Sequence, residues 1–148
     1  MSVNRFEMTP LMLCVLPDVP TSELAPLDGA ATVIVDIRQD WATEAAFHSA
    51  QSVIDRRSKA TGPTLLRVGM PDDDTGQNTI TRLTALRPAG FALSGCGGVA
   101  DIQRFDVMLR VAEAEQGIEP GSLVVFAEVG EHAEFFSRHH PYGMSRGG

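Results

Sequence analysis

The sequence predicts an α/β domain built on parallel strands. Five apolar runs of strand length alternate with helical patterns along most of the chain. Each run is apolar almost throughout, which is typical of a strand covered on both faces. A repeated strand-then-helix order predicts that the strands are parallel. The five runs are Leu11–Leu16, Ala31–Ile37, Thr64–Val68, Gly90–Ser94 and Leu123–Ala127.

The length of the chain narrows the architecture. With 148 residues, the chain suits one domain over 1–148, with residues 139–148 as a loose C-terminal tail. A closed (β/α)8 barrel typically needs about 250 residues, so this chain has length for about five strand–helix units. We therefore expect a partial (β/α) barrel of the TIM type, with about five parallel strands and flanking helices. An open doubly wound sheet is the alternative.

Three segments between the strands have the spacing of amphipathic helices, with apolar residues at steps of three and four. A polar loop over residues 71–76 is expected before the second of them, and Gly117 is a suitable cap for the third. A short helix that begins at Thr21 or Ser22 and another that begins at Glu131 are further expectations. The three segments are Thr43–Ser58, a stretch that carries Ile80 to Leu86 and ends before Pro88, and a stretch that begins at Val99 and is apolar on one side up to Ala112.

Composition argues against several classes of partner. The formal net charge is −7 and the basic residues do not cluster, which disfavours nucleic-acid binding. No apolar run approaches the roughly 20 residues of a membrane helix, and no signal peptide precedes the first strand. Cys14 and Cys96 lie in or beside predicted buried strands. They suit reduced thiols, so we expect a cytoplasmic protein.

Several segments, in the order of the predicted elements, resemble one enzyme family. The segment 31–37 resembles its "AD-V-I-L-D-L-E-D" strand, 66–69 its "V-R-V-N" strand, 90–94 its "G-I-V-L-P" strand and 99–102 its "A-A-D-V" helix opening. The segment 113–123 is similar to its helix–turn–strand passage. The family is the citrate lyase beta subunit family, also called the HpcH/HpaI aldolase superfamily, and the resemblance covers most of the chain.

The resemblance implies chemistry at the C-terminal ends of the strands. Members are (β/α)8 enzymes that make or break carbon–carbon bonds beside a carboxylate, commonly on acyl-CoA substrates, with a magnesium ion held by carboxylates. Such an ion stabilises the enolate that develops as the bond breaks. The resemblance implies that Arg67 binds a substrate carboxylate, with Asp36 and Asp40 beside it. In the alternative reading, Arg67 forms an ion pair with Asp36 or Asp40 that supports the end of the sheet.

Other functional positions of the family have changed in this chain. Its acidic pair after the second strand falls on Arg38 and Gln39, and its Lys and Glu after the fourth fall on Gly95 and Gly97. Its metal-binding Glu falls on Gly130. We therefore expect no catalytic residue. The flanking residues Glu128 and Glu131 are the candidates for a metal ligand.

The turn Gly95–Gly98 has two interpretations. Its backbone amides lie between a predicted strand and a helix N-terminus, where a phosphate or carboxylate could bind. It lacks the dinucleotide-binding spacing and a phosphate-loop lysine, so a tight turn is the preferred interpretation.

The function expected from these observations is assembly without catalysis. The chain resembles a truncated relative that is non-catalytic or regulatory and forms a homo-oligomer, or joins a full-length homologous subunit. A partial barrel leaves two strand edges to be covered, which favours such assembly. Residual binding of a small carboxylate or acyl-CoA is a further expectation. The alternative is a magnesium-dependent lyase of the citryl-CoA or malyl-CoA type, whose site a second chain completes. No cofactor is expected, except magnesium in the lyase reading, and no nucleic acid or membrane partner.

Overall fold

The computed structural model describes residues 12–15, 31–38, 43–57, 62–71 and 74–129. The expected helices at Thr21 and Glu131 and the tail 139–148 lie outside these ranges. The described strands are β1 (Met12–Val15), β2 (Thr32–Asp36), β3 (Thr64–Val68), β4 (Gly90–Leu93) and β5 (Val124–Ala127). The described helices are α1 (Glu44–Arg57), α2 (Asp74–Thr84) and α3 (Val99–Glu115).

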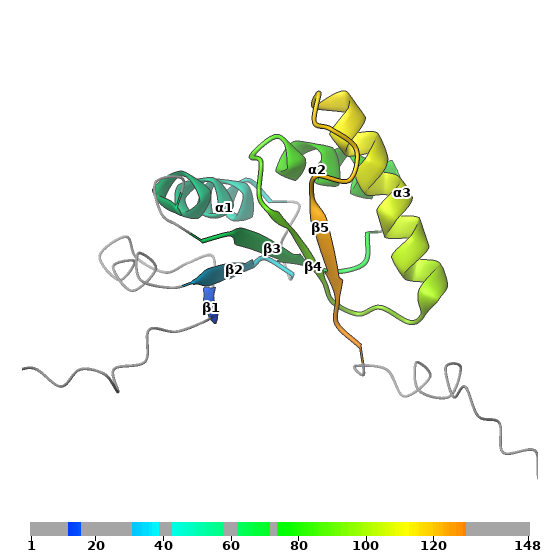
Figure 1. Ribbon diagram of the computed structural model, residues 1–148, viewed down its shortest axis with the longest axis horizontal. Helices are drawn as coiled ribbons and strands as arrows, with labels where there is room; N and C mark the ends of the chain where they lie inside the picture. Colours follow the sequence, from blue (N-terminus) through cyan, green and yellow to red (C-terminus); the bar gives the residue numbers. More distant parts are fainter. Residues whose placement is uncertain (1–11, 16–30, 39–42, 58–61, 72–73, 130–148) are drawn as a thin grey trace, which may run out of the picture.

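The strands form one parallel sheet in the order β1-β2-β3-β4-β5, which confirms the predicted α/β class (Figure 1). A doubly wound sheet would require the strand order to reverse at a switch point. The order of the described strands contains no reversal, so the doubly wound alternative does not apply to this part of the chain.

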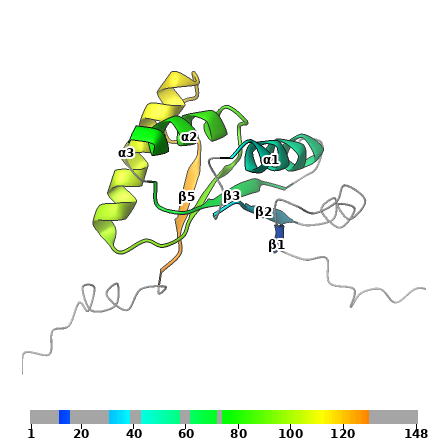
Figure 2. The same cartoon turned by 180° about the vertical axis from the view of Figure 1, so that it is seen from behind.

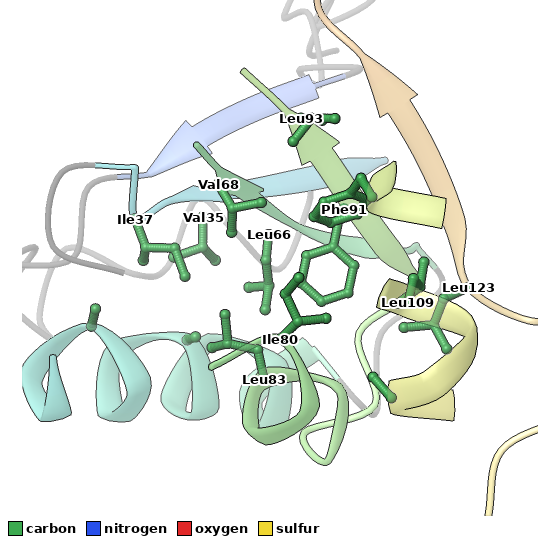
Figure 3. Packing of buried hydrophobic residues seen from close by; sticks show 14 of the residues in the cluster. Val35, Ile37, Leu66, Val68, Ile80, Leu83, Phe91, Leu93, Leu109 and Leu123 are labelled. Atoms are coloured by element: carbon green, nitrogen blue, oxygen red, sulfur yellow. The ribbon is translucent and has the colours of Figure 1, made fainter. Parts of the chain in front are cut away.

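The helices α1, α2 and α3 lie on the same side of the sheet (Figures 1 and 2). Alternate residues of the strands point toward them, because side chains in a strand alternate between its two faces. Figure 3 shows this core, in which Leu66 and Phe91 of the central strands meet Ile80 and Leu83 of α2. The opposite surface, which no described helix covers, is called here the helix-free face.

Within the described residues, no helix has both the length and the apolar character that crossing a membrane requires.

The ends of α1 and α3 agree with the sequence analysis. At the start of α1, the Thr43 hydroxyl accepts a hydrogen bond from the Ala46 amide at 3.2 Å, so Thr43 caps the helix. At the end of α3, Gly117 has a φ of 66°. Its amide bonds to Ala114 O, and the Ile118 amide bonds to Glu113 O. These two bonds form a Schellman motif, and the left-handed φ that the motif requires favours glycine.

The second helix begins and ends earlier than predicted. Asp74 to Gly76 form its first residues rather than a loop, and it ends at Thr84 instead of extending past Leu86. Asp and Thr are common both in loops and in first helical turns, so composition alone did not separate the two. The Arg87 amide bonds to Thr84 O in a tight turn, and Arg87 itself has a φ of 56°.

Three expectations of burial were wrong. Val124 and Phe126 of β5 are 46% and 56% exposed, although the apolar run predicted a strand covered on both faces. Cys14 in β1 is also exposed. These residues belong to the first and last strands of the described sheet. An apolar run indicates a strand, but it does not show which strand becomes an edge. Val99, assigned to the apolar side of α3, is 47% exposed because it is the first residue of that helix.

A buried carboxylate sets the path of the chain into β5. Glu113 of α3 is only 1% exposed. Its two oxygens accept hydrogen bonds from the amides of Gly121 at 2.9 Å and Leu123 at 3.1 Å. Gly90 of β4 then allows β5 to approach, since a side chain there would collide with Val124 O. The position of Glu128, which follows β5, depends on this passage.

Candidate functional site

Four charged residues meet on the helix-free face, at the C-terminal ends of the strands. Asp36 in β2 and Arg67 in β3 are neighbours in the sheet register, so their side chains lie on the same face. Arg38 lies two residues after Asp36, and Glu128 lies two residues after Phe126 of β5. Residues two apart face the same side of a sheet, so Arg38 and Glu128 also lie on the helix-free face. We call Asp36, Arg38, Arg67 and Glu128 the strand-end cluster.

Arg67 lies at the centre of the strand-end cluster. Its Nε donates a hydrogen bond to Glu128 Oε1 at 2.6 Å, and its Nη2 donates to Glu128 Oε2. The two groups thus face each other side-on through two parallel charge-assisted bonds, the geometry that a guanidinium favours with a carboxylate. The remaining nitrogen, Nη1, donates to Asp36 Oδ2 at 3.1 Å.

Asp36 is held by a second arginine as well. The Arg38 Nε donates to both oxygens of Asp36, at 3.0 and 3.2 Å, and the Arg38 amide donates to Oδ1 at 3.2 Å. The side chain of Asp36 is only 9% exposed, so these bonds compensate for its loss of hydration.

The charges of the strand-end cluster balance one another. Burial alone would raise the pKa of Asp36, but hydrogen bonds from Arg38 and the nearby charges of Arg38 and Arg67 outweigh it and hold that pKa below its ordinary value. The hydrogen bonds to Glu128, with the Glu128 and Asp36 charges, raise the pKa of Arg67 above its ordinary value. The cluster thus pairs two arginines with two carboxylates, and their formal charges cancel.

Cys14 lies near this cluster on the helix-free face, since it is in register with Ile34 of β2. Although Cys14 is exposed, the surrounding chain removes part of the hydration of its thiol, and this effect, assisted by the negative charge of Asp36, raises the pKa of the thiol. The thiol is thus kept protonated and is a weak nucleophile near neutral pH.

The bonds within the strand-end cluster leave its two carboxylates poorly placed to hold a metal ion. Both oxygens of Asp36 and both oxygens of Glu128 accept bonds from arginine. A magnesium ion needs several oxygen ligands, and here Arg67 places a positive charge between the two carboxylates. No group of three or more His, Cys, Asp or Glu side chains suited to a metal ion occurs in the described ranges. The described residues therefore do not fit magnesium as they are arranged.

The glycine turn after β4 is held by contacts within its own segment. The Gly97 amide donates to Asp101 Oδ2 at 2.8 Å, so a carboxylate of the chain itself already uses this amide. Cys96 is 1% exposed, and its Sγ lies 3.2 Å from Gly98 O. These contacts agree with the preferred interpretation of the segment as a tight turn.

The structure brings together three of the five site residues that the sequence analysis named. Arg67, Asp36 and Glu128 are in contact, whereas Asp40 and Glu131 lie outside the described residues. The ion pair of Arg67 with Asp36 is the contact that the alternative reading of Arg67 expected.

Sequence reasoning missed Arg38, which it treated as a lost acidic position, and it missed the bond between Arg67 and Glu128. The alternation of side chains along a strand could have predicted where these residues lie. Asp36 and Arg38 are two residues apart, as are Phe126 and Glu128, and each pair therefore faces the same side.

No protein-family model matches this chain, and neither a curated protein nor a solved structure is significantly similar to it.

Proposed function

We propose that this chain is a non-catalytic relative of the citrate lyase beta subunit family that functions by assembling with another protein chain, either a second copy of itself or a full-length homologous subunit. Two features support the relationship. The strands follow one another in sequence order, and the described helices lie on one face, as in consecutive units of a TIM-type barrel. On this proposal, the helix-free face corresponds to the inner surface of such a barrel.

The exposed apolar side chains of β5 are the observation that carries the proposal of assembly. Val124 and Phe126 belong to the last strand of the described sheet and lie on the helix-free face. In a closed barrel, this surface is packed with side chains from all strands. An apolar edge strand without a charged residue is also a ready template for pairing with another chain.

The electrostatics of the helix-free face are compatible with such a contact. The whole chain carries a formal charge of −7, which opposes association of two copies. The strand-end cluster, however, pairs two arginines with two carboxylates, so its charges sum to zero. The strand-end cluster therefore adds no net charge to a contact that this face makes.

Light scattering coupled to size-exclusion chromatography tests the proposal. We expect the purified chain to have the mass of a homodimer at micromolar concentration, because two-fold pairing is the commonest form of self-assembly. If the chain alone is a monomer, it should form a complex with a full-length relative. A stable monomer that binds no such relative would contradict the proposal.

Binding of a small carboxylate or of an acyl-CoA carboxyl group is a second candidate function. The specific observation in its favour is the side-on pair of Arg67 with Glu128, because the guanidinium already holds one carboxylate in the geometry that a ligand would need. The Arg67 side chain is also 20% exposed, so part of it is in contact with solvent.

The lyase alternative requires magnesium and a second chain that supplies the missing carboxylates. The bonds of Asp36 and Glu128 to arginine weigh against it. We expect no magnesium-dependent cleavage of citryl-CoA, malyl-CoA or citramalyl-CoA by the pure chain, because groups that stabilise transition-state charge are each worth about 10²–10³ in rate. Magnesium-dependent turnover would establish the lyase instead.

We also propose a reducing, cytoplasmic location. Its support is that Cys14 and Cys96 are both free thiols, and such thiols persist where disulfides are rare.

A further inference from the structure

Glu128 occupies the part of Arg67 that a bound carboxylate would use. The pair joins Nε and Nη2 of the guanidinium to the two oxygens of one carboxylate. This edge of the guanidinium offers two parallel donors, which is why it suits carboxylates. Nη1, on the other side, is bonded to Asp36. An external carboxylate that approaches Arg67 side-on therefore meets Glu128 already in place.

The two carboxylates around Arg67 differ in how firmly they are held. Asp36 has a 9% exposed side chain and accepts bonds from Arg38 as well as from Arg67. Glu128 has a 30% exposed side chain, and the side-chain bonds described for it all go to Arg67. Displacing Glu128 breaks its bonds to one arginine and returns a partly exposed carboxylate to water, whereas displacing Asp36 breaks contacts with two arginines and moves a nearly buried carboxylate. Glu128 is thus the carboxylate that can exchange.

We propose that Glu128 is a built-in competitor that closes the carboxylate site of Arg67, and that a small carboxylate anion binds there when the Glu128 side chain moves aside. This inference rests on the second candidate function, carboxylate binding at Arg67, and adds the regulation of that site. Asp36 and Arg38 stay in place during the exchange and keep the guanidinium oriented. The ligand class is a compact anion, such as acetate or the carboxylate end of a larger molecule.

The proposal predicts the size of the effect. The apparent dissociation constant equals the intrinsic one divided by the fraction of molecules in which Arg67 is accessible. Minor conformations of this kind are typically populated at about 0.1–10%. Removing the competitor should therefore tighten binding of acetate by about 10- to 1000-fold.

The test compares acetate binding by the wild-type chain, Glu128→Ala and Glu128→Gln. Binding is followed by the NMR signal of the Arg67 Nε–H group and by the melting temperature during titration with sodium acetate. Sodium chloride at the same ionic strength is the control titration. Glu119→Ala is the matched control variant, because it removes an exposed carboxylate from the turn before β5. Glu128→Gln is the variant of choice if Glu128→Ala fails to fold, since it preserves the shape of the side chain.

We expect Glu128→Ala to bind acetate at least about tenfold more tightly than the wild-type chain and Glu119→Ala. Its melting temperature should rise with acetate, and adding Arg67→Ala to the same variant should abolish that rise. Equal affinity in Glu128→Ala and the wild-type chain would overturn the competitor role while leaving the carboxylate site intact. Absence of acetate binding in every variant would overturn both the competitor role of Glu128 and the carboxylate site at Arg67. The assembly proposal is judged separately by light scattering.

Discussion

Arg67 and Glu128 bond to each other across strand β4, although 61 residues separate them in sequence. Arg67 is in register with Ala92 of β4, and Ala92 is in register with Phe126 of β5. Because the alanine side chain is small, the guanidinium can extend over β4 and reach the residue that follows β5. This pair links the middle of the sheet to its last described strand, and the first prediction concerns its contribution to stability.

Arg67→Ala should lower the free energy of unfolding by about 1.5–3 kcal/mol, the usual range for hydrogen bonds to charged groups. The variant also leaves Glu128 and Asp36 without this cation. Arg67→Lys should lose less stability than Arg67→Ala, because its ammonium group keeps the positive charge. It should still be less stable than the wild-type chain, because an ammonium group cannot form the side-on pair. Urea unfolding monitored by circular dichroism measures both values.

The matched control is Arg82→Ala. Arg82 of α2 also forms a two-bond pair, at 2.5 and 2.7 Å with Glu44 of α1, and lies 4.0 Å from the centre of the Phe47 ring. That pair is exposed to solvent, so its loss should cost less than the loss of Arg67. Equal costs for the two variants would show that the strand-end cluster contributes no more than a surface pair.

Asp36→Asn should remove a pH-dependent part of the stability. The pKa of Asp36 is lowered in the folded chain from an ordinary value of 3.8. Its contribution is therefore complete above pH 3.8 and is lost as the pH falls through the lower folded-state pKa. The wild-type chain should be more stable than Asp36→Asn at neutral pH, and the difference should shrink below pH 3.8.

Urea unfolding of the two proteins between about pH 2 and pH 7 measures this difference. Asp106→Asn is a suitable control, because Asp106 is half exposed and lies 3.6 Å from Arg110 on the same helix. The difference in stability between Asp106→Asn and the wild-type chain should be smaller than the difference that Asp36→Asn shows. A constant difference between Asp36→Asn and the wild-type chain across the whole range would be inconsistent with a lowered pKa of Asp36.

Glu113→Ala should destabilise the chain by about 1–3 kcal/mol, because the amides of Gly121 and Leu123 lose their buried acceptor. Glu113→Gln should lose less stability than Glu113→Ala, since the single carbonyl oxygen of its side chain can still accept a hydrogen bond. Because Glu113 positions the passage into β5, hydrogen exchange of the Val124 and Glu128 amides should also become faster in Glu113→Ala. Unchanged exchange at both amides would argue against this role.

Phe126→Glu should shift the chain toward the monomer, because it places a charge on the apolar edge of the helix-free face. Val107→Glu is its control: Val107 is 62% exposed and Phe126 56%, but Val107 lies on α3. Analytical ultracentrifugation over a range of concentrations gives the dissociation constant of each dimer. A weaker dimer in Val107→Glu but not in Phe126→Glu would place the interface on α3 instead.

The sequence by itself determined the class of the fold and most of its elements. Alternating apolar runs and amphipathic segments predicted parallel strands with helices between them, because burial on both faces and helical periodicity leave local signatures. The helix from Thr43 and the cap at Gly117 were predictable for the same reason, since capping depends on a few neighbouring residues.

Only the tertiary structure decided which residues meet and which strands have an exposed face. An ion pair between Arg67 and Asp36 was one of the sequence-based expectations, but the bonds between Arg67 and Glu128 were not. Those bonds depend on the order of the strands and on the small side chain of Ala92. The exposure of Phe126 likewise depends on the position of β5 as the last described strand. Periodicity reports how a segment is buried on average, whereas contacts between distant segments arise from packing, which no single segment encodes.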